Sequence, residues 1–185
     1  MIPLEKIKTI EKYCDKIYSN GRQQHIKDMV FDPNRTGKEV NLQGLGAEIW
    51  FKEKHNIPYT LFEDKENFIP RSYKKDIDCM MEGIQLEIKQ TSYPTGCLFL
   101  NEIDHYGKKR KMISEMFVLI IGSFPDYSHE LYLSKKELLD RFPEPTYHKR
   151  IGKRGYHSEQ DKMYQTFKEA HEYNGNTGTS SSTMP

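Results

Sequence analysis

A stretch of alternating apolar and polar residues around one glycine constrains the fold of this chain more than any other feature. It runs from Lys74 to Tyr93 with the sequence KKDIDCMMEGIQLEIKQTSY. On both sides of Gly83 the apolar residues recur at every second position, which is the period of a strand with one buried face. A glycine also supplies the positive φ that a tight turn needs. We therefore expect two antiparallel strands joined by Glu82 and Gly83.

The register of this hairpin decides which charged side chains meet. A two-residue turn places Asp78 opposite Glu87, and directly opposed side chains lie roughly 5 Å apart on one face of a sheet. Asp76 and Lys89 then lie on the same face, with apolar residues behind them. A three-residue turn would instead divide the carboxylates between the two faces. If the register differs, Asp76 takes the place of Asp78.

Two carboxylates and a lysine on one strand face are the side chains of a metal-dependent hydrolytic site. Neighbouring carboxylates repel one another, so each raises the pKa of the other unless a cation intervenes. Mg²⁺ prefers oxygen ligands, usually one or two carboxylates together with water and substrate phosphate. A lysine two residues from a carboxylate can reach the same water or phosphate, as metal-assisted attack on a phosphodiester requires. The other interpretation is an ordinary exposed strand face of alternating charge.

The order of Asp78, Glu87 and Lys89 resembles the signature of the PD-(D/E)XK nuclease superfamily. The resemblance covers roughly residues 40 to 140. Upstream, GLGAEIWFKEKHN (44–56) resembles the first core helix of that family. Downstream, TSYPTGCLFL and MFVLIIG resemble the third and fourth core strands of its small phage and restriction-type members. Ile77 stands where the family signature has a proline that many members lack.

The resemblance implies a restriction-endonuclease-like α/β domain, in which helices flank a mixed central sheet. It also implies hydrolysis of phosphodiester bonds in nucleic acid, with DNA favoured over RNA. Asp78 and Glu87 would hold Mg²⁺, for which Mn²⁺ could substitute, and the Ile88 carbonyl would be a further ligand. Lys89 would orient the attacking water or help to deprotonate it.

The resemblance also implies roles for two more side chains. Glu48 on the first core helix would be an extra metal ligand or a water-binding carboxylate, and a solvated helix glutamate is an equally good interpretation. Gln90 would bind a phosphate oxygen or a water molecule outside the metal's own ligands.

The sequence does not exclude a nuclease that acts on RNA, and many members of the superfamily act as homodimers. A non-catalytic nucleic-acid-binding or structural module is the rival class, but such modules usually lose at least one of Asp78, Glu87 and Lys89.

The charge balance limits how nucleic acid could bind. The formal net charge is +1, so any contact with a polyanion must come from local basic patches. Three segments supply candidates, and each is equally well explained as a solvated charge run. They are Lys74, Lys75, Lys108, Lys109, Arg110, Lys111, Lys149, Arg150, Lys153 and Arg154.

The chain of 185 residues is long enough for one domain with a sizeable core. We expect a single domain over 1–173, with its core at about 40–142, and a disordered tail over 174–185. The apolar patterns predict helices at 3–19, 42–56 and 135–142, the second capped by Asn41, and strands at 97–100, 116–121 and 130–133. A flexible basic loop and a helix that begins after Ser158 should follow, within 146–173.

The remaining features exclude several classes. No apolar run approaches the ~20 residues of a membrane span, and the N-terminus lacks the shape of a signal peptide, so we expect an intracellular protein. Cys14, Cys79 and Cys97 form no paired framework, which fits a reducing compartment and argues against a structural zinc site. The histidines show no metal-ligand spacing.

Overall fold

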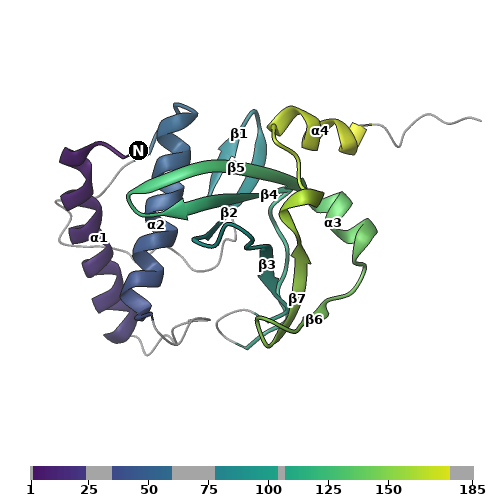
Figure 1. The fold of residues 1–185 in the computed structure, drawn as a ribbon, viewed down its shortest axis with the longest axis horizontal. Helices are drawn as coiled ribbons and strands as arrows, with labels where there is room; N and C mark the ends of the chain where they lie inside the picture. The colour runs from purple at the N-terminus through teal and green to yellow at the C-terminus, as the bar shows by residue number, and fades with distance from the viewer. Residues whose placement is uncertain (1, 24–34, 60–77, 104–106, 176–185) are drawn as a thin grey trace, which may run out of the picture.

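The computed structural model describes residues 2–23, 35–59, 78–103 and 107–175, which form a mixed α/β fold (Figure 1). Its helices are α1 (Leu4–Gln23), α2 (Gly37–Lys54), α3 (Lys135–Arg141) and α4 (Phe167–Gly175), with a 3-10 turn η1 (Gln160–Lys162). Its strands are β1 (Cys79–Met81), β2 (Ile84–Thr91), β3 (Leu98–Asn101), β4 (Met116–Ser123), β5 (Asp126–Ser134), β6 (Thr146–His148) and β7 (Lys153–Ser158). Within the described ranges, no helix is long and apolar enough to span a membrane. Lys74, Lys75, Asp76 and the tail 176–185 lie outside the described residues.

The main sheet has the strand order β1-β2-β4-β5. Strands β2 and β4 run parallel, whereas β1 with β2 and β4 with β5 pair antiparallel. Helix α2 packs on one face of this sheet, and α1 lies alongside α2 (Figure 1). Helix α3 contributes to the core on the other face. The expected mixed central sheet flanked by helices is therefore confirmed.

The hairpin that orders the charged residues has the expected two-residue turn. Glu82 and Gly83 have φ angles of 51° and 83°, the positive values that suit the tight turn of a twisted antiparallel ribbon. Met81 faces Ile84 in the ladder, and the same register, extended outward, places Asp78 opposite Glu87. The alternative with a three-residue turn is excluded.

Strand β4 is buried on both faces, as its continuous apolar sequence predicts. Met116, Val118 and Ile120 pack in the core shared with α2 and α4. The alternating residues Phe117 and Leu119 point the other way, into a core shared with β3 and α3. Successive side chains of a strand point to opposite faces, so the residues of β2, which runs parallel to β4, alternate between the same two faces, and Leu86 and Ile88 pack in the core shared with α2.

A second, three-stranded antiparallel sheet, ordered β3-β7-β6, covers the Phe117 and Leu119 side. This sheet corrects two predictions. The strand expected at 97–100 is β3, but it pairs with β7 rather than with the main sheet. The expected flexible basic loop is the β6–β7 hairpin. Its glycines and charges are typical of a loop, and β7 pairs with β3 residues that lie 54 to 60 positions earlier, from Asn101↔Gly155 to Leu98↔Ser158.

Helix boundaries differ from the predicted ones at three places. Helix α1 continues through Gly21 to Gln23. Helix α2 begins at Gly37 rather than at 42, because Thr36 and Glu39 form a capping box and Asn41 lies inside the helix. Strand β7 and the 3-10 turn occupy the segment after Lys153, so the last helix begins only at Phe167.

Candidate functional site

The charged residues of the hairpin lie on the side of the main sheet that faces away from α2. Leu86 and Ile88 pack in the core formed with α2, so Glu87 and Lys89, which alternate with them, point to the opposite side. Asp78 lies on that side as well, because it is opposite Glu87. The structure therefore brings together the aspartate, the glutamate and the lysine that the sequence singled out.

Glu87 is the centre of this group and is only 1 % exposed. Its Oε1 atom lies 2.5 Å from the Lys89 ammonium and also accepts a hydrogen bond from the Arg110 guanidinium. Its Oε2 atom is buried and accepts no hydrogen bond from the described residues. A buried carboxylate oxygen that lacks a partner is energetically costly. A small divalent cation bound at Oε2 would remove that cost.

The Lys89 side chain keeps its positive charge at neutral pH, because its pKa is raised. Burial by itself lowers the pKa of this lysine, but the charges of Glu87 and Asp78 outweigh burial, and the pKa lies above its ordinary value of 10.5. Lys89 is therefore an ammonium at neutral pH and cannot accept a proton from water in this state. One third of its side chain remains exposed, which leaves it able to contact a bound anion.

Asp78 is held in place by the strand opposite it. Its Oδ2 atom accepts a hydrogen bond of 2.7 Å from the backbone N–H of Ile88. This bond fixes the carboxylate against β2, beside Glu87. The carboxylates of Asp78 and Glu87 are adjacent, and the buried Glu87 Oε2 atom accepts no hydrogen bond from the described residues. Carboxylate oxygens in such an arrangement are the ligands that Mg²⁺ or Mn²⁺ prefers.

Glu48 and Gln90 have different surroundings from those expected. Glu48 is buried on α2, 3.8 Å from the Lys52 ammonium, and α2 covers the opposite face of the sheet from Glu87. The Gln90 side-chain amide donates a hydrogen bond of 2.5 Å to the Gly122 carbonyl. Gln90 thus ties β2 to β4, although it also lines the cavity described below.

The described candidate phosphate contacts differ in exposure. Arg110 points inward, with 11 % of its side chain exposed, to bind Glu87. Arg150 and Arg154 are exposed; Arg154 lies 3.0 Å from Glu102, and Arg150 lies 3.8 Å from Glu159. The exposed lysines are Lys108, Lys109, Lys111, Lys149 and Lys153.

A cavity of about 540 Å³ extends from Lys89 across to the second sheet. Arg35 and Arg150 also line it, so three cationic side chains face one space. Arg35 is positioned by a hydrogen bond of 2.6 Å to the Ser92 hydroxyl. A cavity with this charge suits an anionic ligand such as a phosphate group.

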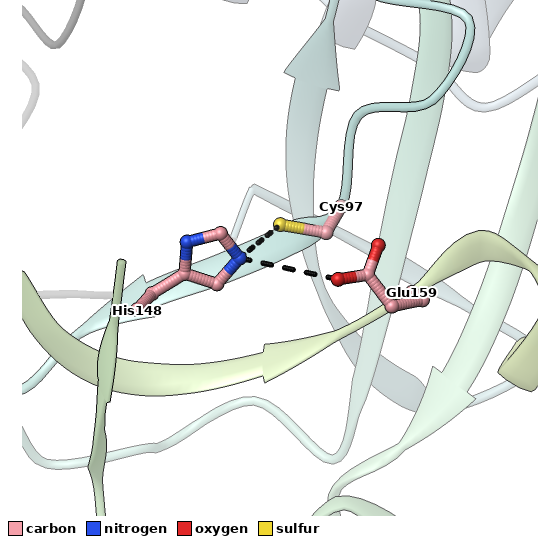
Figure 2. A group of neighbouring side chains, drawn as sticks. All are labelled: Cys97, His148 and Glu159. Atoms are coloured by element: carbon pink, nitrogen blue, oxygen red, sulfur yellow. Dashed lines mark hydrogen bonds and ion pairs between the residues drawn. The ribbon is translucent and has the colours of Figure 1, made fainter. Parts of the chain in front are cut away.

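Sequence reasoning missed a second cluster at the far side of this cavity. Cys97, His148 and Glu159 point toward one another (Figure 2), and their ligand atoms all lie within 4.8 Å of one another. Burial raises the pKa of the Cys97 thiol and lowers the pKa of the His148 imidazole. No local spacing could have indicated this cluster, because only the pairing of the second sheet brings its three members together.

Comparisons with protein-family models, with curated proteins and with solved structures each found no match to this chain. The function is therefore inferred from the geometry of the two clusters and of the cavity beside them.

Proposed function

We propose that this protein is a metal-dependent nuclease that hydrolyses phosphodiester bonds of nucleic acid, DNA in preference to RNA. One observation carries the proposal. The buried, unsatisfied Oε2 atom of Glu87 lies in a group with Asp78 and with the permanently charged Lys89. Adjacent carboxylates that hold a divalent cation, next to an ammonium, are suited to bind and polarise a phosphodiester.

Asp78 and Glu87 would hold the cation, Mg²⁺ or Mn²⁺, which when bound polarises a phosphate and lowers the pKa of a water molecule. The Ile88 N–H keeps Asp78 oriented for this task. The Ile88 carbonyl remains a proposed further ligand. Lys89 would neutralise a phosphate oxygen or orient the attacking water, rather than act as a general base, because its pKa is raised.

The cavity beside Lys89 would receive the polyanionic substrate. Its cationic side chains Arg35 and Arg150 would contact phosphates on either side of the one attacked, as salt-dependent backbone binding requires. The exposed lysines at 108, 109, 111, 149 and 153 would extend this contact. Arg110 would not extend this contact with the substrate, because its guanidinium points inward and binds Glu87.

A non-catalytic nucleic-acid-binding module is the second candidate, and the contact between Arg110 and Glu87 favours it. A guanidinium on Oε1 neutralises the carboxylate that would otherwise attract a metal ion. If that ion pair persists in the presence of Mg²⁺, the site has structural rather than catalytic chemistry. The basic cavity could then still bind phosphates without cleaving them.

The proposal is tested by cleavage. Supercoiled plasmid, linear duplex, single-stranded DNA and RNA are incubated with the protein in Mg²⁺, Mn²⁺ or EDTA. Lys89→Ala is compared with Lys168→Ala, whose side chain is 85 % exposed on α4. Metal-dependent cutting that disappears only in Lys89→Ala supports the nuclease. Binding of nucleic acid without cutting, by both variants and the natural sequence alike, supports the binding module.

A further inference from the structure

Cys97, His148 and Glu159 come from three different places in the second sheet. Cys97 immediately precedes β3, His148 is the last residue of β6, and Glu159 directly follows β7. The His148 Nε2 atom lies 3.5 Å from the Cys97 sulfur and 4.0 Å from the Glu159 Oε1 atom. Figure 2 shows that both neighbours approach this one nitrogen.

The sulfur–nitrogen separation agrees with the dimensions of a tetrahedral zinc centre, whereas the Glu159 carboxylate, now 4.0 Å from the His148 Nε2 atom, would have to approach to roughly 3.4 Å. Zinc binds cysteine sulfur at about 2.3 Å and histidine nitrogen at about 2.0 Å, so a tetrahedral angle between them gives a sulfur–nitrogen separation of roughly 3.5 Å. The observed separation is 3.5 Å. The His148 side chain is 8 % exposed, and its ring contacts the edges of Phe99 and His157. The imidazole is therefore held in the orientation that the centre needs.

We propose that Cys97, His148 and Glu159 form a Zn²⁺ site. A sulfur, a nitrogen and one carboxylate oxygen select zinc over magnesium, which prefers oxygen ligands alone. When Zn²⁺ binds, the Cys97 sulfur gives up its proton to solvent and becomes the thiolate ligand. This site is separate from the Asp78 and Glu87 group and does not depend on the proposed nuclease activity.

The fourth position of this site would open into the basic cavity, because two of the three ligands line it. Cys97 and His148 both line the cavity of about 540 Å³ into which Lys89 and Arg150 also project. Three protein ligands with one open position are the pattern of zinc sites that bind water or a further ligand, whereas purely structural sites have four protein ligands. The open position would therefore take water or an anionic group that enters the cavity.

Metal binding has to displace only weak contacts. The His148 Nδ1 atom accepts a long hydrogen bond of 3.3 Å from the Ile151 N–H, so the neutral ring carries its proton on Nε2. Zinc at Nε2 requires the other tautomer, and that long bond is then lost. The ion pair between Arg150 and Glu159 spans 3.8 Å on the surface, where such pairs contribute little.

Cobalt titration tests this site without any measurement of activity. Chelator-treated full-length protein is titrated with Co²⁺, which reports cysteine ligation through a sulfur-to-cobalt absorption band. We expect one ion per chain with this band in the natural sequence and in the control Cys79→Ser. We expect Cys97→Ser to lose the band and Glu159→Gln to bind about tenfold more weakly or worse, within the range found for perturbed metal sites.

Thermal unfolding with Zn²⁺ provides the second readout. A ligand that binds only the folded state raises Tm, so Zn²⁺ should raise the Tm of the natural sequence and of Cys79→Ser but not that of Cys97→Ser. Circular dichroism confirms that each variant is folded. The proposal is overturned if Co²⁺ produces no sulfur band, if the band survives in Cys97→Ser, or if Zn²⁺ raises the Tm of all three proteins equally.

Discussion

The Arg110 guanidinium and the Lys89 ammonium bind the same oxygen of one buried carboxylate, Glu87 Oε1. Sequence reasoning had placed Arg110 in a surface patch with its three lysine neighbours. Its inward orientation gives it a different role, because it compensates a charge that is only 1 % exposed.

Removal of this partner should strongly destabilise the fold. Loss of one member of a buried ion pair costs about 3–5 kcal/mol when the other charge is left uncompensated. Because Lys89 still binds Glu87 Oε1, we expect Arg110→Ala to reduce the free energy of unfolding by less than this, by about 2–3 kcal/mol in metal-free buffer. Lys111→Ala, on an exposed residue of the same segment, should change it by less than about 0.5 kcal/mol. Urea denaturation measures both, and equal effects of the two substitutions would contradict the role of Arg110.

The Tm of Arg110→Ala should also rise when Mg²⁺ is added. Without the guanidinium, Lys89 is the remaining cation that the structure shows on Glu87 Oε1, so Mg²⁺ bound at this carboxylate should recover part of the lost stability of Arg110→Ala. The comparison is the Tm of this variant with Mg²⁺ and with EDTA, beside that of Lys111→Ala. If Mg²⁺ shifts neither Tm, the Glu87 carboxylate does not bind the ion.

The raised pKa of Lys89 predicts a charge role that arginine can partly replace. We expect Lys89→Arg to keep measurable cleavage and Lys89→Met to lose at least about 100-fold, as for the removal of one electrostatic stabiliser. In the natural sequence, deprotonation of Lys89 should not lower the cleavage rate until the pH exceeds 10.5, the ordinary pKa of a lysine. Rates of cleavage between pH 6 and 10 check this. Equal rates for Lys89→Met and Lys89→Arg would show that the charge is not needed.

The same pKa shift has a consequence for stability. Because the pKa of Lys89 is higher in the folded protein, its ion pair with Glu87 stabilises the fold fully below the unfolded pKa of the lysine. That contribution is lost only as the pH rises through the folded value. Urea denaturation at alkaline pH should therefore show a steeper loss of stability for the natural sequence than for Lys89→Met.

Two glycines of α2 should respond in opposite directions to alanine. A methyl group at Gly46 would lie 2.5 Å from Phe124 Cδ2 and 2.5 Å from the Tyr127 hydroxyl oxygen, whereas nothing lies within 4 Å of one at Gly44. We expect Gly46→Ala to lower the free energy of unfolding by about 1–3 kcal/mol. Gly44→Ala should raise it by about 0.5–1 kcal/mol through helix propensity. Equal changes in Tm would show that α2 does not pack closely on β5.

Glu130 should contribute to the loss of stability in acid. Burial alone raises the pKa of this carboxyl, but hydrogen bonds with His55 and Lys54 outweigh burial, and the pKa lies below its ordinary value. Its stabilisation is therefore present above the unfolded pKa, near 4.3 for a free glutamate, and is lost as the pH falls through the lower folded value.

Glu130→Gln isolates this contribution. The variant should be less stable than the natural sequence at pH 7, by about 1–3 kcal/mol, because Lys54 and His55 lose a buried charged partner. The difference should narrow as the pH falls from 6 to 3. Glu144→Gln, at an exposed position, is the control. A difference in unfolding free energy that stays constant with pH would contradict the lowered pKa.

Local sequence patterns predicted the parts of the fold that depend on neighbouring residues. The hairpin at Glu82 and Gly83 has the expected register, because a two-residue turn fixes the pairing on both sides. The apolar run of β4 indicated burial on both faces. The helix expected after Ser158 is present only from Phe167, because strand β7 and the 3-10 turn occupy the preceding residues.

Features that depend on distant pairing could not be predicted in this way. The β6–β7 hairpin looked like a loop, because its strands are defined by the pairing of β6 with β7 and of β7 with β3, and not by their own alternation. For the same reason, the histidine spacing gave no indication of the cluster of Cys97, His148 and Glu159. The inward orientation of Arg110 is equally non-local, since its partner Glu87 lies on strand β2, 23 residues away.

The most direct test of the central claim is calorimetric titration of Mg²⁺ into the natural sequence, Asp78→Asn and Asp161→Asn. Asp161 is a matched control, because its side chain is 70 % exposed on the 3-10 turn. We expect one Mg²⁺ site in the natural sequence and in Asp161→Asn, and its loss in Asp78→Asn while the fold is intact. Binding of Mg²⁺ that is unchanged in Asp78→Asn would contradict a metal site at Asp78 and Glu87.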